Sequence, residues 1–301
     1  MIDPRRLRVL RALADHGTVT AAGKALHFSP SAVSQQLAAL ESEVGQELLH
    51  RHGRRVRLTS AGQLLVRHAD AVLTELDRAD ASMAAHAIGT LGTVEIAAFA
   101  SSIIHVVAPA LAVLRTEVPN LTVLVRDAEG QDSMSLLLDG SVDLAVAVGY
   151  LIEPAPDNRV VRDPLYTDPF DVLLPPGHAL AGLPEVDLHA LAEDDWIAPL
   201  EGNPCRDVVL AAGQRAGFTP RVTHVSDDFH AEAALVAAGA GVALVPRTAL
   251  GGAHGAVVRP VSGTAPVRRV FAAIRRGRED HPRISAVHDA LQEVAAGAST
   301  G

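Results

Sequence analysis

A run of hydroxyl and amide side chains near the N-terminus has the spacing of a surface that reads nucleic acid. Apolar residues between 30 and 44 recur at helical spacing and predict one buried face, while Ser31, Ser34 and Gln35 share the opposite face. Small hydrogen-bonding side chains suit base edges and phosphates, and they let a helix lie close to the floor of a groove. The chemistry indicated is non-covalent recognition of DNA. The contacts predicted from this stretch are Thr18, Thr20, Ser29, Pro30, Ser31, Ser34, Gln35 and Gln36.

Four arginines follow this predicted recognition helix. Arg51, Arg54, Arg55 and Arg57 lie around Gly53, which predicts a turn between two short strands. A hairpin this basic is suited to contact with phosphates or the minor groove, and we expect Arg51, Arg54 and Arg55 to make such contacts. The alternatives are a solvated basic hairpin and an amphipathic helix pair with a polar solvent face.

Three short helices must position these side chains. The first is predicted to open at Asp3 and to end at Gly17, and the second spans about residues 19–26. Ser29 is the expected N-cap of the third, with Pro30 at its first position, where the missing N–H costs nothing.

A long helix is predicted to begin at Ser60. Its apolar residues alternate steps of four and three, which is the a/d pattern of a coiled-coil seam. This apolar stripe is narrow, which favours its burial against the same helix of a second copy of the chain. The alternative is that the helix packs against another part of its own chain. The predicted dimerisation residues are Leu65, Ala69, Val72, Leu76, Ala79 and Met83.

After Gly89 the pattern changes to strands that alternate with helices, which is typical of parallel sheets. One set of strands precedes residue 164, a second follows it, and a last strand returns to the first set. Two crossings between two lobes would make a hinge. The predicted strands are residues 94–100, 121–127, 142–149, 170–175, 195–199, 221–225, 241–246 and 268–276.

Composition limits the possible functions. The 301 residues suffice for two or three domains, and their net charge is −9. Residues 1–60 nevertheless carry nine Arg or Lys against five Asp or Glu, whereas the remainder carries 17 against 30. A basic N-terminal part followed by an acidic remainder suits a protein in which only the N-terminal part contacts the phosphates of a nucleic acid.

Targeting signals and cysteines point to one compartment. The first thirty residues lack the pattern of a signal peptide, and no apolar run has the length of a membrane span. We therefore expect a cytoplasmic protein without a membrane partner. Cys205 is the only cysteine, which excludes an intramolecular disulfide and a cysteine-based metal cage.

In this order the segments resemble a LysR-type transcriptional regulator over essentially the whole chain. The resemblance is carried by residues 7–62, by VPNLTVLVRDAEG with LLLDGSVDLAV, and by LVAAGAGVALVP. It implies the fold class: an N-terminal winged helix-turn-helix (residues 1–60), a linker and dimerisation helix (61–88), and a two-lobed α/β effector domain like a periplasmic binding protein (89–301). Lobe I would comprise about residues 89–163 and 267–297, and lobe II about 164–266.

The resemblance also implies partners. Promoter DNA would bind the N-terminal domain, and a small-molecule co-inducer would bind between the lobes, with no other cofactor and no metal. The chain would form a homodimer and, as is usual for the family, a homotetramer, with RNA polymerase as a further partner.

The sequence departs from the family pattern at several positions. Gly23 stands where the second helix usually has alanine, at an expected cost of about 0.5–1 kcal/mol. Pro30 and Ser31 replace the commoner Gln-Pro, and Gln35 stands where arginine is frequent. Because Pro30, Ser31 and Gln35 lie on the face predicted to contact bases, the resemblance does not indicate which operator sequence is bound.

The effector site is expected at the carboxyl ends of the strands. Ser101 and Ser102 follow the first strand, and their hydroxyl and N–H groups suit an anion such as a carboxylate. Ser101 could instead be a helix cap, and Leu200 ordinary core. Further positions follow other strands at the same edges. The predicted effector-binding residues are Ser101, Ser102, Gly130, Gln131, Val148, Gly149, Pro199, Leu200, Asn203, Asp227 and His230.

Two of these positions bear on the class of effector. Val148 stands where the resemblance leads one to expect arginine in relatives that respond to aromatic acids, which weakens that class. Asp227 and His230 favour a cationic or polar effector, unless Asp227 is the N-cap of the following helix.

Catalytic motifs give no support to an enzyme. No histidine pair shares a helix face with a glutamate, and neither GxSxG nor GxxxxGK[ST] occurs. The alternative function is a cytoplasmic small-molecule-binding protein or enzyme whose N-terminal helices serve only for assembly. For Cys205, a buried thiol is the commoner state and a redox role is the alternative.

Overall fold

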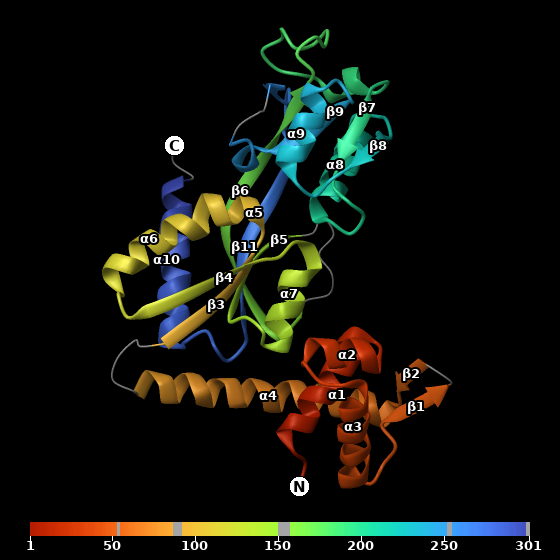
Figure 1. The fold of residues 1–301 in the computed structure, drawn as a ribbon, viewed down its shortest axis with the longest axis vertical. Coiled ribbons are helices and arrows are strands. Elements are labelled where there is room, and N and C mark those ends of the chain that lie inside the picture. Colours follow the sequence, from red (N-terminus) through yellow and green to blue (C-terminus); the bar gives the residue numbers. More distant parts are fainter. Residues whose placement is uncertain (53–54, 87–91, 150–156, 252–254, 299–301) are drawn as a thin grey trace.

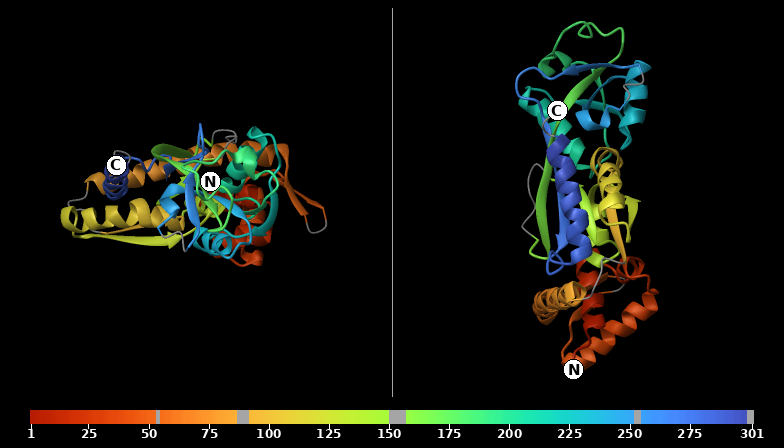
Figure 2. Two further views of the ribbon diagram at one scale, coloured as in Figure 1. Left: turned by 90° about the horizontal axis from the view of Figure 1, so that it is seen from above. Right: turned by 90° about the vertical axis from the view of Figure 1, so that its left-hand side faces the viewer.

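Three parts follow one another along an elongated molecule (Figures 1 and 2). The computed structural model describes residues 1–52, 55–86, 92–149, 157–251 and 255–298, without the side chains of residues 51, 52, 55, 130, 131 and 298. The N-terminal helices lie at one end, and the long helix α4 (Ser60–His86) extends from them beneath the first α/β lobe. The second lobe forms the other end.

Capping residues set the ends of the first three helices, and the predicted caps Asp3, Gly17 and Ser29 are confirmed. Asp3, Thr18 and Ser29 each accept a hydrogen bond from a backbone N–H in the turn that follows. Gly17 and Gly45 end the first and third helices in the left-handed conformation. The elements of this part are α1 (Pro4–His16), α2 (Val19–Ala25), α3 (Pro30–Val44) and an antiparallel hairpin of β1 (Leu49–His52) and β2 (Arg55–Leu58).

Gly23 has a packing role in addition to its expected cost to the second helix. Gly23 is buried where α2 meets the turn before α3, and a Cβ at this position would lie 2.7 Å from the carbonyl oxygen of Phe28. No carbon side chain fits at that distance, so the close approach of α2 and α3 requires glycine.

The apolar stripe of α4 is divided between two environments. Leu65 and Ala69 pack on the core that α1, α3 and the hairpin share. Beyond them, Val72, Leu76 and Met83 are exposed apolar side chains. These three side chains are therefore partly or fully exposed in the single chain, and Leu76 also lines a cavity between α4 and lobe I.

Lobe I is a sheet with helices on both faces. Strands β3, β4 and β5 are parallel; α6 and α10 cover one face, and α7 covers the other. The elements are β3 (Gly92–Ala98), α5 (Ala100–Ser102), a π-helical turn (Ile103–Val107), α6 (Ala108–Glu117), β4 (Leu121–Asp127), α7 (Gly130–Asp139), β5 (Leu144–Val148) and α10 (Pro282–Ala298).

Lobe II repeats this plan around the buried Trp196. Strands β7, β8 and β9 are parallel, and α8 and α9 pack in separate apolar clusters on the two sides of the sheet. The elements are β7 (Asp195–Ala198), α8 (Pro204–Arg215), β8 (Arg221–Val225), α9 (Phe229–Ala237), β9 (Val242–Pro246), β10 (Val257–Pro260) and 3-10 turns at Leu188–Leu191 and Arg247–Ala249.

Two long strands join the lobes. β6 (Val160–Leu174) and β11 (Val267–Arg275) pair antiparallel and connect both lobes into one nine-stranded sheet (Figure 1). The expectation of a parallel sheet is wrong for these strands, because β11 also runs antiparallel to β5, and β6 runs antiparallel to β9 and β10. The predicted class is confirmed: a winged helix-turn-helix, a long linker helix and a two-lobed α/β domain.

No helix among the described residues combines the length and the apolarity that crossing a bilayer requires.

Candidate nucleic-acid interface and interlobe site

Helix α3 separates a buried face from a hydrogen-bonding face. Val33 and Leu37 lie in the N-terminal core, whereas Ser31 and Gln35 are exposed and Ser34 is half-buried. Ser29 and Pro30 are also exposed at the start of the helix, and the hydroxyl oxygens of Ser29 and Ser31 lie 2.9 Å apart. This face can donate to and accept from base edges without any change in the helix.

The other predicted contacts around this helix have different surroundings. Thr18 and Thr20 are exposed at the start of α2, and the Thr18 hydroxyl caps that helix. Gln36 is half-buried, and its Oε1 accepts a hydrogen bond from Nε of Arg6 at 3.2 Å. Gln36 therefore ties α1 to α3 and presents less of its amide to a ligand than Gln35 does.

The hairpin lies beside α3 as the predicted wing. His50 pairs opposite Arg57, and both are exposed. Arg54 lies outside the described residues, as do the side chains of Arg51 and Arg55. The contacts expected of these three arginines stay predictions.

A buried arginine joins the two lobes. Arg268 of β11 is 2% exposed, and its Nε lies 3.0 Å from Oδ2 of Asp168 on β6. Its Nη2 donates to the hydroxyl of Ser101 from lobe I at 2.9 Å and to that of Thr248 from lobe II at 3.1 Å. A buried cation is tolerated only when it is paired and hydrogen-bonded, and here the partners come from both lobes.

Aromatic rings and the cysteine complete the surroundings of Arg268. Its guanidinium carbon lies 4.9 Å from the ring centroid of Phe99 and 5.8 Å from that of Phe229, within the range of cation–π attraction. Its Nη1 lies 3.8 Å from the Sγ of Cys205. Burial raises the pKa of Cys205 to about 11, so the thiol is protonated at neutral pH.

The two predicted serines of lobe I have different partners. Ser101 lies inside α5, which begins after Phe99, so its interpretation as a helix cap is wrong. Its hydroxyl accepts from Arg268 and faces the other lobe. Ser102 is fully buried and donates to the carbonyl oxygen of Phe99, so its hydroxyl is engaged within lobe I.

In lobe II, three predicted residues form one hydrogen-bonded group. Asn203 caps α8 by accepting from the N–H of Cys205, and its Nδ2 donates to Oδ1 of Asp227 at 3.0 Å. The same oxygen of Asp227 accepts from the N–H of Leu200, whose side chain is exposed and not in the core. The N-cap of α9 is Asp228, so the alternative role for Asp227 is wrong.

The remaining predicted positions lie at the same strand ends. Val148 is the last residue of β5, and the N–H of Gly149 donates to the carbonyl oxygen of Arg269. Pro199 is buried after β7, His230 is exposed at the start of α9, and residues 130–131 open α7.

Two carboxylates at this site were missed by the sequence reasoning. Glu232 of α9 is fully buried, and burial followed by the charges of Asp227 and Asp228 raises its pKa to about 8. Glu129, between β4 and α7, has its pKa raised to about 7 by burial and by Asp227. An acidic residue on the same helix face as Phe229 was the available signal for Glu232.

Arg268 and Asp168 were missed as well. Arg268 alternates with Val270 and Ala272, so its side chain shares their inward face of the strand. A charged residue at an inward strand position was the signal that could have found it. The described residues contain no group of three His, Cys, Asp or Glu side chains placed to hold a metal ion.

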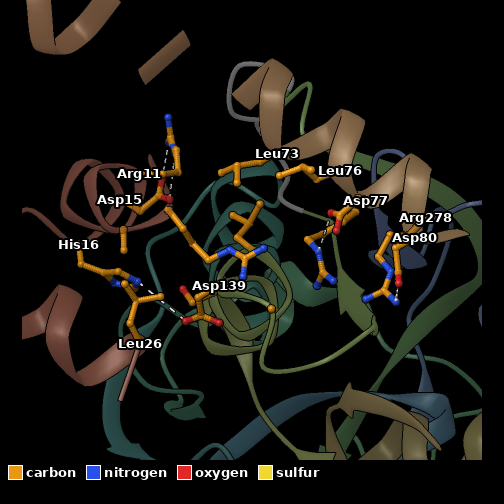
Figure 3. Close-up of a pocket in the computed structure, with 16 residues that line it drawn as sticks. Arg11, Asp15, His16, Leu26, Leu73, Leu76, Asp77, Asp80, Asp139 and Arg278 are labelled. Atoms are coloured by element: carbon orange, nitrogen blue, oxygen red, sulfur yellow. Dashed lines mark hydrogen bonds and ion pairs between the residues drawn. The ribbon is translucent and has the colours of Figure 1, made fainter. Parts of the chain in front are cut away.

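A cavity of about 540 Å³ lies where α1 and α4 meet lobe I (Figure 3). Leu73 and Leu76 of α4 line it together with charged side chains of both parts. Aspartates of α1 and α4 pair there and nearby with arginines of the effector domain, so charge complementarity contributes to this junction. The pairs are Arg159–Asp15 (2.9 Å), Arg275–Asp77 (3.2 Å) and Arg278–Asp80 (3.0 Å).

Comparison with known proteins places both parts in one family. Residues 4–63 match the family described as "Bacterial regulatory helix-turn-helix protein, lysR family", and residues 87–296 match "LysR substrate binding domain". The chain is 32% identical over 245 residues to a "Probable hydrogen peroxide-inducible genes activator" of Mycobacterium avium, covering 81% of this chain and 78% of that protein.

Two further proteins show the same likeness. The chain is 34% identical over 250 residues to the "HTH-type transcriptional regulator TfdS" of Cupriavidus pinatubonensis, covering 80% of this chain and 81% of that protein. The fold resembles that of a full-length OxyR variant from Pseudomonas aeruginosa, with a TM-score of 0.67 and 23% identity over 97% of this chain and 95% of that one.

Proposed function

The chain belongs to the LysR family of transcriptional regulators, and from this membership we propose how its parts divide the work. Helix α3 and the hairpin bind promoter DNA, and a small-molecule co-inducer in the interlobe cleft alters that binding. The observation that carries the first part is the geometry of α3, which buries Val33 and Leu37 and exposes Ser31 and Gln35. The alternative, a binding protein or enzyme with assembly helices, is not favoured.

Dimerisation through α4 is part of this proposal. Val72, Leu76 and Met83 form an exposed apolar stripe at heptad spacing, and a second copy of α4 would cover it. We extend the proposal to a homotetramer, to contact with RNA polymerase and to action in the cytoplasm, where promoter DNA lies. The co-inducer is the one ligand proposed; no metal, cofactor or catalytic activity is part of the function.

The route from the cleft to the DNA runs through β6 and β11. Closure of the lobes on a co-inducer would bend these two strands, which carry Asp168 and Arg268. Arg275, at the end of β11, pairs with Asp77 of α4. A change at the hinge would thereby reach the helix that sets the spacing of the two DNA-binding domains.

A gel shift on the DNA upstream of the protein's own gene tests the DNA-binding part. We expect a specific complex that weakens steeply with salt. The Arg54→Ala/Arg55→Ala variant should have a shallower salt slope, by about one unit for each phosphate that the hairpin no longer neutralises. Arg221→Ala, which removes an exposed arginine of lobe II, is the control. Equal binding and equal slopes for all three proteins would contradict the role of the hairpin.

A second candidate function is a response to hydrogen peroxide through Cys205. The contact between its Sγ and Nη1 of Arg268 favours it, and so does the name of the Mycobacterium avium relative. In such a response the Cys205 thiolate would attack one peroxide oxygen, giving sulfenic acid and hydroxide. The raised pKa of Cys205 makes this second to the co-inducer. Intact-mass spectrometry of the peroxide-treated wild type and Cys205→Ser variant tests this function. Formation of sulfenic acid at Cys205 would add the mass of one oxygen to the wild type but not to the variant.

A further inference from the structure

Carboxylates of the two lobes lie close enough to influence one another electrostatically. Glu129 follows β4 of lobe I, and its carboxylate lies beside the N–H of Ala100. Asp227 and Glu232 come from lobe II. Asp227 is near enough to add to the effect of burial on the pKa of both glutamates, and both glutamates add to the effect of burial on the pKa of Cys205. All four groups therefore share one region at the lobe boundary.

Glu232 has no partner for either carboxylate oxygen among the described residues, although its side chain is 0% exposed. Buried polar groups normally have a hydrogen-bond partner, and an exception calls for an explanation such as a missing ligand. Side chains of an α-helix tilt toward its N-terminus, so Glu232 points toward the end of α9 where Asp227 and Asp228 lie. Phe229, three residues earlier on the same face, contacts Arg268 at the lobe boundary.

The charge of Arg268 favours the ionised form of Glu129, but the ion pair and hydrogen bonds of Arg268 are made with other residues. Arg268 is paired with Asp168 at 2.9 Å and hydrogen-bonded to Ser101 and Thr248. Asp227 is held by the N–H of Leu200 and the amide of Asn203, both uncharged donors. Burial raises the pKa of Glu129 to about 7 and of Glu232 to about 8, so both carboxyl groups can ionise near neutral pH when a positive charge lies beside them. Together with Asp227 they favour a cationic ligand over an anionic one.

We propose that the co-inducer is an organic cation whose ammonium or guanidinium group bridges Glu129 of lobe I and Glu232 of lobe II, with Asp227 beside it. The proposal rests on the proposed function and specifies its ligand. Such a group supplies several N–H donors to the unpartnered oxygens of Glu232. It also relieves the repulsion between the lobes, so its binding favours the closed state. An organic cation is favoured over a metal ion because the described residues contain no group of three His, Cys, Asp or Glu side chains placed to hold a metal.

Thermal unfolding of the full chain with a panel of probes tests this class. The cationic probes are putrescine, agmatine, arginine and lysine; succinate and benzoate are the anionic ones, and Mg²⁺ and Ca²⁺ represent metals. We expect at least one organic cation to raise the midpoint of unfolding at millimolar concentration. By calorimetry, Glu129→Gln and Glu232→Gln should each weaken its binding by about tenfold to a hundredfold, the usual loss for one charged hydrogen bond. Glu185→Gln, at an exposed position of lobe II, should bind as the wild type does.

The other outcomes overturn the proposal. Stabilisation by anions or metals alone contradicts the class of ligand, as does a panel without any stabilising cation. Binding of a cation that is unchanged by Glu129→Gln and Glu232→Gln contradicts the site. A gel shift on the same samples distinguishes failure of the cation proposal from failure of the proposed function. A protein that binds its promoter but binds no cation would still be a transcriptional regulator.

Discussion

Arg268 and Asp168 form an ion pair of 2.9 Å in which both side chains are almost completely removed from solvent. Each residue sits on one of the two strands that connect the lobes, so the pair fixes the register of β6 and β11 at the hinge. Thr248 contributes two more hydrogen bonds to Asp168, through its N–H at 3.1 Å and its hydroxyl at 2.6 Å.

Arg268→Met should destabilise the effector domain by about 3–5 kcal/mol, because it leaves the carboxylate of Asp168 buried without its cation. Denaturant unfolding of the full chain measures the change. The double variant Arg268→Met/Asp168→Asn should recover part of the loss, since no unpaired charge remains. Arg221→Met is the control: its pair with Asp195 is exposed and should contribute less than about 1 kcal/mol. Similar losses for Arg268→Met and Arg221→Met would contradict this account.

Gly23→Ala should destabilise the DNA-binding domain by about 1–3 kcal/mol, the usual cost of overpacking. The added Cβ would meet the carbonyl oxygen of Phe28 at 2.7 Å, and α2 would have to move away from α3. Gly177→Ala is the matched control, because nothing lies within 4 Å of a Cβ there. Thermal unfolding compares the two, and a Gly23→Ala protein as stable as the wild type would refute the packing argument.

Glu232→Gln should stabilise the protein increasingly as the pH rises. The pKa of Glu232 is about 8 in the folded chain against an ordinary value of 4.5, so the folded state holds a proton that the unfolded state has lost. The contribution of this proton to stability is complete below about pH 4.5 and is lost as the pH rises to about 8. Glutamine does not titrate, so the difference in unfolding midpoint between variant and wild type should grow across this window. A constant difference would exclude a buried, protonated Glu232, and Glu185→Gln serves as the control.

Leu76→Asp should dissociate the proposed dimer by placing a charge in the seam of α4. Leu183→Asp is a close control, because both leucines are 45% exposed and Leu183 lies in lobe II, away from α4. Sedimentation velocity reports the oligomeric state directly. An unchanged sedimentation coefficient for Leu76→Asp would place the dimer interface elsewhere. Dissociation of both variants would mean that the effect is not specific to the seam of α4.

Local signals predicted the elements whose ends carry their own capping chemistry. Asp3, Gly17 and Ser29 determine helix ends through contacts within one turn, so the first helix begins and ends, and the third helix begins, as expected. The strands of both lobes were predicted for a similar reason, since runs such as residues 144–148 and 242–246 are apolar throughout.

Long-range pairing could not be predicted in the same way. β6 begins at Val160, ten residues before the predicted strand, because Pro164 and Pro169 disfavour a strand when only local sequence is considered. In the fold these prolines pair opposite Phe271 and Val267, near an irregularity in the register of β11. β10 was missed because its four residues gain their stability from pairing with β6.

The candidate site depends even more on distant contacts. Ser101 and Asp227 were found from their positions at strand and helix ends. The partners of Asp227, which are Leu200 and Asn203, were predicted with it. The partner of Ser101 was not, because Arg268 lies 167 residues from Ser101 and meets it only after both crossings have formed.

The arginine–aspartate pairs between lobe I and the helices α1 and α4 make the placement of the DNA-binding domain depend on ionic strength. Partly exposed ion pairs weaken as salt rises, and contacts with phosphate weaken over the same range. A salt titration of promoter binding therefore combines ion release from DNA with loosening of the domain junction. The slope of the wild type alone is therefore not a count of phosphates, whereas the difference between two proteins with the same junction still is. Asp77→Asn, which opens the junction without touching DNA, measures the contribution of the junction itself.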